Sequence, residues 1–103
     1  AAGARVVLTT GGTGVSPRDV TPEAVAGLLR AELPGVAEQI RAAGLASTPL
    51  AVLSRGVVGV VGPDPGSALV VCAPGSTGGV RDTVAVVGPL VGHIVDQLLG
   101  GDH

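Results

Sequence analysis

The sequence predicts an α/β domain, in which helices cover the faces of a β-sheet. Short β-branched runs at residues 5–10, 57–62 and 68–73 are typical of buried strands. Apolar residues at helical spacing fill much of the chain between and after these runs. A glycine-rich loop follows two of the predicted strands and precedes a helix, which is an order typical of layered α/β folds.

The first predicted strand, residues 5–10 (RVVLTT), ends at a run of glycines. A helix start follows, with Thr21 predicted as the N-cap, Pro22 at the first helical position and Glu23 in the first turn. The apolar spacing extends this helix to Leu33. The region therefore predicts a strand, a glycine loop and one long helix.

The next segment predicts a second helix near residues 36–44, because Pro34 and Gly35 would end the first helix. Gly44 is a natural residue to end this second helix. The run at residues 50–56 (LAVLSRG) fits either a strand or one or two turns of helix.

The second half of the chain predicts a hairpin and a final helix. Residues 57–62 and 68–73 flank a Pro/Gly turn, which predicts an antiparallel pair of strands. Helical spacing then covers residues 80–99, with a kink or break predicted at Gly88 and Pro89.

The composition supports one domain over residues 1–103 with an aliphatic core. Hydrophobic residues make up 46% of the chain although Phe, Trp, Tyr and Met are absent, so Val, Leu, Ile and Ala form the predicted core. The net charge of −2 and the lack of aromatic rings argue against a nucleic-acid partner. No apolar run reaches the roughly 18 residues that a membrane-spanning helix needs. A single cysteine, Cys72, excludes an internal disulfide and a multi-cysteine metal site, and predicts a buried, inert thiol.

Two glycine-rich loops are the candidate binding elements. GGTG at residues 11–14 and PGSTGG at residues 74–79 each lie between a predicted strand and a predicted helix. Such loops place backbone N–H groups near a positive helix end, which suits a phosphate group. Thr13, Ser76 and Thr77 add hydroxyl groups. The alternative is that the glycines only make tight turns, and neither loop is a P-loop or a dinucleotide fingerprint.

Asp19 is the acidic side chain that follows the first glycine loop most closely. It suits Mg²⁺ beside a phosphate, because Mg²⁺ takes one or two carboxylates together with phosphate oxygens and water. The alternative is that Asp19 caps its loop or pairs with Arg18. Arg55 and Arg81 lie near the predicted loops and suit a phosphate contact, although Arg81 fits a surface pair with Asp82 equally well.

TTGGTGVSPRDVTPEA at residues 9–24 resembles the signature of the family of molybdenum-cofactor biosynthesis proteins that includes Mog, MoaB and the gephyrin G domain. The resemblance continues through ELPGVAEQIR at residues 32–41, LSRGVVGV at residues 53–60 and APGSTGGVRD at residues 73–82. It covers essentially the whole chain, and the contiguous SPRDVTPEA argues against the related domains of molybdate-insertion and competence-damage proteins.

The resemblance implies a three-layer α/β/α molybdopterin-binding domain with a mostly parallel sheet and a hairpin. Relatives carry an N-terminal strand–helix–strand portion with a second acidic residue, and the given sequence is expected to start after that portion. The family usually assembles as trimers or hexamers, and the apolar hairpin fits such an interface. A cytoplasmic location and a molybdate-insertion protein as partner are further expectations.

The activity that the resemblance implies is Mg²⁺-dependent transfer of AMP from ATP to molybdopterin. The alternative is a non-catalytic molybdopterin-binding module. An upstream carboxylate of the complete chain, across the pocket from Asp19, would favour catalysis, and an apolar residue at that position would favour the binding module. Asp19 would be the catalytic residue and the metal ligand. The residues implied for substrate binding are Gly11, Gly12, Thr13, Gly14, Ser16, Ser54, Pro74, Gly75 and Ser76.

Overall fold

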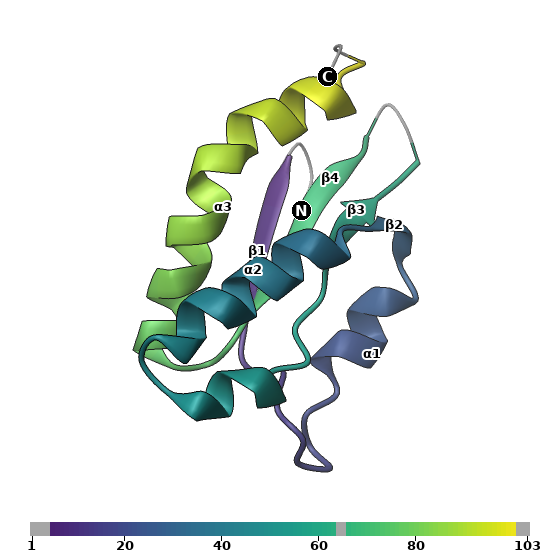
Figure 1. Cartoon of the computed structure of the whole chain (residues 1–103). Coiled ribbons are helices and arrows are strands. Elements are labelled where there is room, and N and C mark those ends of the chain that lie inside the picture. The colour runs from purple at the N-terminus through teal and green to yellow at the C-terminus, as the bar shows by residue number, and fades with distance from the viewer. Residues whose placement is uncertain (1–4, 64–65, 101–103) are drawn as a thin grey trace.

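The computed structural model describes residues 5–63 and 66–100. Its elements are arranged around one sheet (Figure 1). In chain order they are β1 (Val6–Thr10), α1 (Thr21–Ala26), β2 (Leu29–Glu32), α2 (Pro34–Leu45), the 3-10 helix η1 (Pro49–Leu53), β3 (Val58–Val61), β4 (Ala68–Ala73) and α3 (Thr77–Leu98).

The sheet has the strand order β1-β4-β3-β2. β1 runs parallel to β4, with Thr10 opposite Ala73, and the predicted hairpin of β3 and β4 is confirmed by their antiparallel pairing. β2 pairs antiparallel with β3. The α/β fold is therefore confirmed, but the described sheet is mixed rather than mostly parallel, because β2 joins the hairpin instead of continuing a helix.

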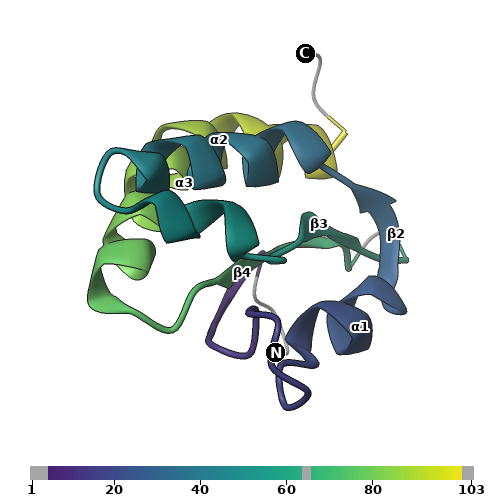
Figure 2. The same ribbon diagram turned by 60° about the horizontal axis from the view of Figure 1, so that its bottom comes forward.

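Helices lie on both sides of this sheet. Figure 2 shows α2 and α3 together over one face and α1 on the opposite side. The core lies under α2 and α3 and is aliphatic, as the composition predicts. Its buried residues are Ala37, Ile40, Val58, Leu69, Val71 and Val87.

The predicted helix from Thr21 to Leu33 is wrong in its second half. α1 ends at Ala26, and Leu29 begins strand β2. Leucines in this stretch fit both a helical and a strand period, so pairing with β3 decides the outcome. Gly59 of β3 makes that pairing possible, because a Cβ atom there would lie 2.5 Å from the Ala31 carbonyl oxygen and 2.7 Å from Leu29 Cδ1.

Two predicted helix boundaries also differ. Val20 rather than Thr21 is the N-cap of α1, and it makes no side-chain capping bond. The Thr21 backbone N–H donates instead to the Gly12 carbonyl at 3.1 Å, which ties α1 to the first glycine loop. Pro34 begins α2 instead of ending the previous helix, since its fixed φ and missing N–H suit a first helical position.

The ambiguous segment before β3 forms the 3-10 helix η1, whose N-cap Thr48 accepts a bond from the Leu50 amide at 3.2 Å. α3 begins at Thr77, three residues earlier than predicted, and is not interrupted at Pro89. Pro89 has no N–H to donate to the Ala85 carbonyl one turn earlier. Because both residues are exposed, that carbonyl can bind water instead. Among the described helices, none combines the length and apolar character that would let it cross a membrane.

Candidate functional site

A cleft of about 610 Å³ opens at the carboxyl ends of β1 and β4, within the range of small-molecule sites. Because these two strands are parallel neighbours, the loops that follow them leave the sheet at the same edge. The predicted binding residues that line the cleft are Gly11, Gly12, Thr13, Gly14, Ser54, Pro74, Gly75 and Ser76, and Asp19 lines it as well. The structure thus brings the two glycine-rich loops into one site.

The two loops touch through their glycines. The Gly11 N–H donates to the Ala73 carbonyl at 3.0 Å, and a Cβ atom on Gly75 would lie 3.3 Å from Gly11 Cα. Gly11 and Gly12 have φ values of +87° and +71°, which L residues with side chains rarely adopt. Glycine is therefore required for the turn itself at Gly12, and it also leaves backbone open to a ligand. The two interpretations of these glycines, as residues of a tight turn and as part of a phosphate-binding loop, are therefore compatible.

Another part of the cleft lining, from α2 to η1, is largely aliphatic. It includes Ile40 of α2 together with Leu50, Ala51 and Leu53 of η1, and Arg41 and Thr48 add polar groups there. Leu50 and Leu53 are exposed large hydrophobic residues in the described structure. The cleft thus has a glycine-rich polar side and an aliphatic side, an arrangement that suits a ligand with a phosphate end and a flat or apolar end.

Asp19 caps its own loop and borders the cleft at the same time. Its Oδ2 accepts a bond from the Ser16 backbone N–H at 2.9 Å, and its own N–H donates to the Ser16 carbonyl at 2.9 Å. No ion pair joins Asp19 to Arg18 in the part of the chain that the structure describes. Gly14 lies against this carboxylate, since a Cβ atom on Gly14 would be 2.8 Å from Asp19 Oδ2.

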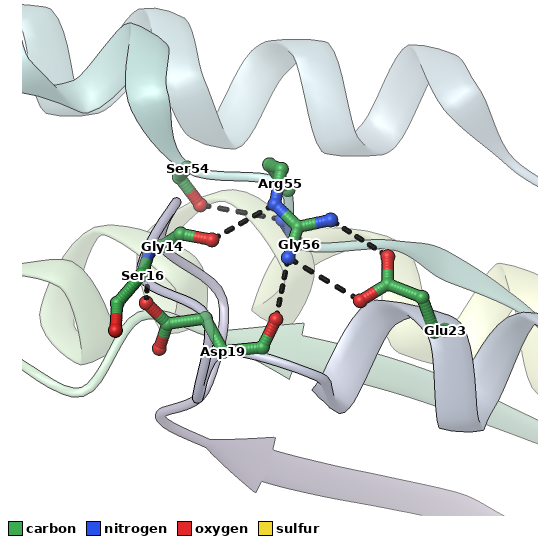
Figure 3. A network of polar contacts seen from close by, with 7 residues as sticks. All are labelled: Gly14, Ser16, Asp19, Glu23, Ser54, Arg55 and Gly56. Atoms are coloured by element: carbon green, nitrogen blue, oxygen red, sulfur yellow. Dashed lines mark hydrogen bonds and ion pairs between the residues drawn. The ribbon is translucent and has the colours of Figure 1, made fainter.

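Arg55 anchors the first glycine loop through hydrogen bonds to its backbone carbonyls (Figure 3). Its backbone N–H donates to the Thr13 carbonyl at 2.7 Å, and its side chain donates to the Gly14 carbonyl at 2.8 Å and the Asp19 carbonyl at 2.6 Å. It also pairs with Glu23, with 2.6 Å between Nη1 and Oε2. The guanidinium therefore binds protein groups, and it does not line the cleft as the phosphate interpretation required.

The pair of Arg55 and Glu23 shifts both ionisation equilibria. The hydrogen bond from Arg55, and secondarily its charge, lowers the pKa of the Glu23 carboxyl below its ordinary value. The same hydrogen bond raises the pKa of Arg55. The Glu23 side chain is 60% exposed and the Arg55 side chain 37%, so solvent screens their attraction. The pair therefore matters more for orienting the guanidinium than for global stability.

The hydroxyl residues of the prediction have different positions. Thr13 is buried at 4% exposure and lines the cleft. Ser54 Oγ lies 3.4 Å from the Gly56 amide, and Ser76 Oγ caps α3 by accepting from the Gly79 amide at 3.0 Å. Ser16 is exposed and does not line the cleft; its backbone holds Asp19.

Two charged cleft residues were missed by sequence reasoning. Arg41, predicted on a solvated helix face, lines the cleft and donates to the Ser54 and Gly56 carbonyls at 3.4 and 3.3 Å. Asp82, predicted as a possible surface partner of Arg81, also lines the cleft from α3. Its position between the α3 start and α2 is a tertiary feature, although its place one turn after the second glycine loop is a signal that could have found it.

The donor set of the cleft fits a magnesium ion held jointly with a substrate. Its side chains offer carboxylate and hydroxyl oxygens, which are the ligands that Mg²⁺ prefers. Within the described ranges no group of three or more His, Cys, Asp or Glu side chains is placed to hold a metal alone. Mg²⁺ commonly binds through one or two carboxylates plus phosphate oxygens, so this arrangement fits an ion that arrives with a nucleotide.

Comparison with known proteins decides the family. Residues 1–93 match the family described as "Probable molybdopterin binding domain". The chain belongs to this family. Its resemblance to Mog and MoaB proteins is confirmed by the solved structure of the molybdopterin biosynthesis Mog protein from Mycobacterium ulcerans, which is 48% identical with a TM-score of 0.86 over 92% of this chain and 60% of that one.

Curated relatives show the same likeness. The molybdopterin adenylyltransferase of Helicobacter pylori is 37% identical over 95 residues, which cover 92% of this chain and 52% of that protein. The molybdenum cofactor synthesis protein cinnamon of Drosophila melanogaster is 42% identical over 98 residues, covering 95% of this chain and 16% of that protein. The chain of this molybdopterin-binding domain thus spans about half of the bacterial relative and a small part of the fly protein.

Proposed function

We propose that this molybdopterin-binding domain serves in molybdenum cofactor biosynthesis by transferring AMP from ATP to molybdopterin. The observation that carries the proposal is the single cleft in which both glycine-rich loops and the Asp19 carboxylate meet. The adenylyltransferase name of the Helicobacter pylori relative supports it. A cleft with a phosphate-type side and an aliphatic side suits a substrate that carries both a ring system and a phosphate.

The reaction needs positioning and charge neutralisation more than a covalent nucleophile. A terminal phosphate oxygen of molybdopterin bonds to the α-phosphorus of ATP, while the bond from that phosphorus to the α,β-bridging oxygen breaks. Pyrophosphate leaves with the electron pair of the broken bond. Gly12, Gly14 and Gly75 line the cleft without side chains, so their backbone N–H groups are accessible to the reacting phosphates, although the Gly12 and Gly14 carbonyls bind Thr21 and Arg55.

The remaining roles fall to a few side chains. The start of α3, with Ser76 and Gly78 in the cleft lining, offers the positive end of a 22-residue helix to an anion. Asp19 would hold Mg²⁺ together with substrate phosphates. Mg²⁺, when bound, supplies neutralisation of the phosphate charge. The Asp19 carboxylate is pre-oriented for this role by the Ser16 amide.

The decisive experiment measures AMP transfer with ATP, Mg²⁺ and molybdopterin for the full chain that contains this sequence and for its Asp19→Ala variant. We expect transfer to fall at least about 100-fold, as for loss of a group that acts on transition-state charge. Ser16→Ala keeps the backbone amide and is the matched control. Unchanged transfer in Asp19→Ala would remove Asp19 from the mechanism.

A second arm uses Asp82→Asn, because Asp82 brings another carboxylate into the same cleft. A loss of transfer in this variant would mean that both carboxylates serve the reaction. Binding of molybdopterin without transfer in the unaltered protein would instead support a non-catalytic binding module.

We also propose that the protein assembles as a trimer or hexamer in the cytoplasm. The hairpin of β3 and β4, which the sequence analysis assigned to the interface, is mostly buried within the described domain. Exposed apolar side chains of β1 support an interface instead, with Val6 at 37% and Leu8 at 44% exposure among the described residues. Sedimentation analysis of the full chain tests the assembly, and a monomer at working concentrations would contradict it. The cytoplasmic location and the molybdate-insertion partner rest on the resemblance.

A further inference from the structure

We infer that Arg55 is the positioning residue of the catalytic loop, and that it acts on Asp19 through the backbone rather than through substrate. The inference rests on the proposed function for its kinetic consequence. Its structural basis is independent of that function, since it consists of contacts between Arg55 and the loop formed by residues 13–19.

The contacts of Arg55 are spread along this loop. Counting its backbone N–H, Arg55 donates to the carbonyls of Thr13, Gly14 and Asp19 at 2.7, 2.8 and 2.6 Å. These carbonyls belong to residues at both ends of the turn, so one side chain fixes the spacing between the glycine run and the acid. Bonds from an ionised donor are stronger than those between neutral groups.

The loop has a local bond as well, but that bond cannot fix its place in the molecule. Ser16 and Asp19 bond to each other across three residues. Such a bond shapes the turn and moves with it. The Arg55 side-chain contacts span 36 and 41 residues of sequence, its backbone contact with Thr13 spans 42, and together they attach the turn to the segment that leads into β3. Arg55 therefore determines where the Asp19 carboxylate lies relative to the rest of the cleft.

Glu23 orients the guanidinium for this task. Arg55 Nη1 lies 2.6 Å from Glu23 Oε2, and Nη2 lies 3.3 Å from Oε1. With Glu23 on one edge, the remaining N–H groups point to Gly14 and Asp19 (Figure 3). Lysine cannot reproduce this set, because an ammonium group is a point donor and lacks the planar fork.

Ser54 and Arg55 are neighbours in the chain, and together they connect the loop of residues 13–19 to the lining of the cleft. Ser54 lines the cleft, whereas Arg55 faces the loop from the other side and lies outside the cleft lining. Arg55 is therefore not in a position to contact a substrate bound in this cleft. Its loss should leave ligand binding by the glycine loops and the aliphatic wall largely intact, while Asp19 loses its fixed place. We expect kcat to fall and KM to change little.

The experiment compares Arg55→Ala and Arg55→Lys with Arg18→Ala in the full chain. Arg18 is the control because it lies in the loop of residues 13–19, carries the same charge as Arg55 and is exposed. We expect kcat for AMP transfer to fall about 10- to 100-fold in both Arg55 variants, in the range that small misplacement of a catalytic group costs. Arg18→Ala should leave kcat unchanged.

Chemical rescue separates positioning from general destabilisation. Ethylguanidinium added to Arg55→Ala should restore part of kcat, whereas ethylammonium at the same concentration should not. A fall in kcat that tracks a lower Tm, with no rescue by ethylguanidinium, would overturn the inference. So would an equal loss of kcat in Arg18→Ala.

Hydrogen exchange keeps the inference testable if the protein transfers no AMP. The amides of Val15, Ser16 and Asp19 should exchange faster in Arg55→Ala than in the unaltered protein and in Arg18→Ala. Absence of transfer in the unaltered protein together with this faster exchange would refute the proposed function and support the positioning role. Equal exchange in all three proteins would refute the positioning role.

Discussion

The two glycine-rich loops of the cleft are built in different ways. The loop before α3 is held locally, because Ser76 caps the helix that starts one residue later and the described glycines of this loop have ordinary φ values. The loop after β1 needs two glycines at positive φ and contacts from Arg55, far along the chain. One loop is thus encoded by its own residues, and the other depends on tertiary contacts.

The largest expected effect comes from breaking the tertiary loop at Gly12. Gly12→Val places a β-branched residue at φ +71° and drives its Cβ into the Thr21 side chain. We expect a loss of about 3 kcal/mol or more in the free energy of unfolding, from backbone strain and steric overlap together. Urea unfolding measures it.

The control for this variant is Gly78→Ala at the start of α3, where an added Cβ would meet nothing within 4 Å. It should not destabilise the protein. Equal unfolding midpoints for the two variants would mean that the first loop is not strained by a side chain at Gly12.

A substitution at Gly14 tests the first loop more selectively, because it displaces the Asp19 carboxylate while the loop keeps its fold. In Gly14→Ala the new Cβ lies 2.8 Å from Asp19 Oδ2, so the carboxylate must move. We expect AMP transfer to fall about 10-fold or more, as displaced catalytic groups lose rate, with little change in Tm. Gly75→Ala in the second loop has a looser 3.3 Å contact with Gly11 Cα and should lose less activity. The opposite ranking in the transfer assay would contradict this account of Asp19.

The locally encoded loop should respond to loss of its cap. Ser76→Ala removes the oxygen that accepts the Gly79 amide bond at 3.0 Å. We expect destabilisation of about 1 kcal/mol, typical for a lost N-cap, measured by thermal unfolding. Ser76→Asp retains an acceptor for the amide and should recover most of the loss. A variant Ser76→Ala as stable as the unaltered protein would show that the cap does not hold this loop.

The smallest effect concerns the pH dependence of the Arg55 and Glu23 pair. The pKa of Glu23 is lowered in the folded protein, so its contribution to stability is present above its unfolded pKa of about 4.3 and is lost as pH falls through the lower folded value. We expect Glu23→Gln to be slightly less stable than the unaltered protein at pH 7, with the difference vanishing as pH falls below the lowered folded pKa of Glu23. A series of Tm values from pH 7 into the acid range tests this; a constant difference would exclude the ion pair as its cause.

Sequence reasoning succeeded where a short segment carries its own signal. The strands β1, β3 and β4 follow from their β-branched runs, and the hairpin follows from the Pro/Gly turn between residues 61 and 68. Helix α3 follows from its apolar spacing, although its start was placed three residues late because the Ser76 cap was not recognised. The family, too, was readable from the contiguous motif at residues 9–24 and is confirmed by comparison.

Sequence reasoning failed where two segments decide the structure together. β2 forms because Gly59 admits Leu29 and Ala31 against β3, which no helical or strand period at residues 29–32 reveals. Arg55 was interpreted as a phosphate contact because it was placed near a predicted glycine loop, whereas its side chain binds Glu23 and the carbonyls of residues 36 and 41 positions earlier. The predicted roles of Asp19 and of the substrate-binding residues stay predictions, although the structure places all of them except Ser16 along one cleft.

Cys72 gives the protein an internal reporter. It is the single thiol of the sequence and is 3% exposed in β4, next to the point where the strand passes into the second glycine loop. A thiol reagent can reach it only when this strand opens, so its rate of alkylation measures opening of the central sheet. Slower labelling in the presence of a nucleotide or a pterin would reveal ligand binding in the unaltered protein, without an engineered probe or a catalytic assay.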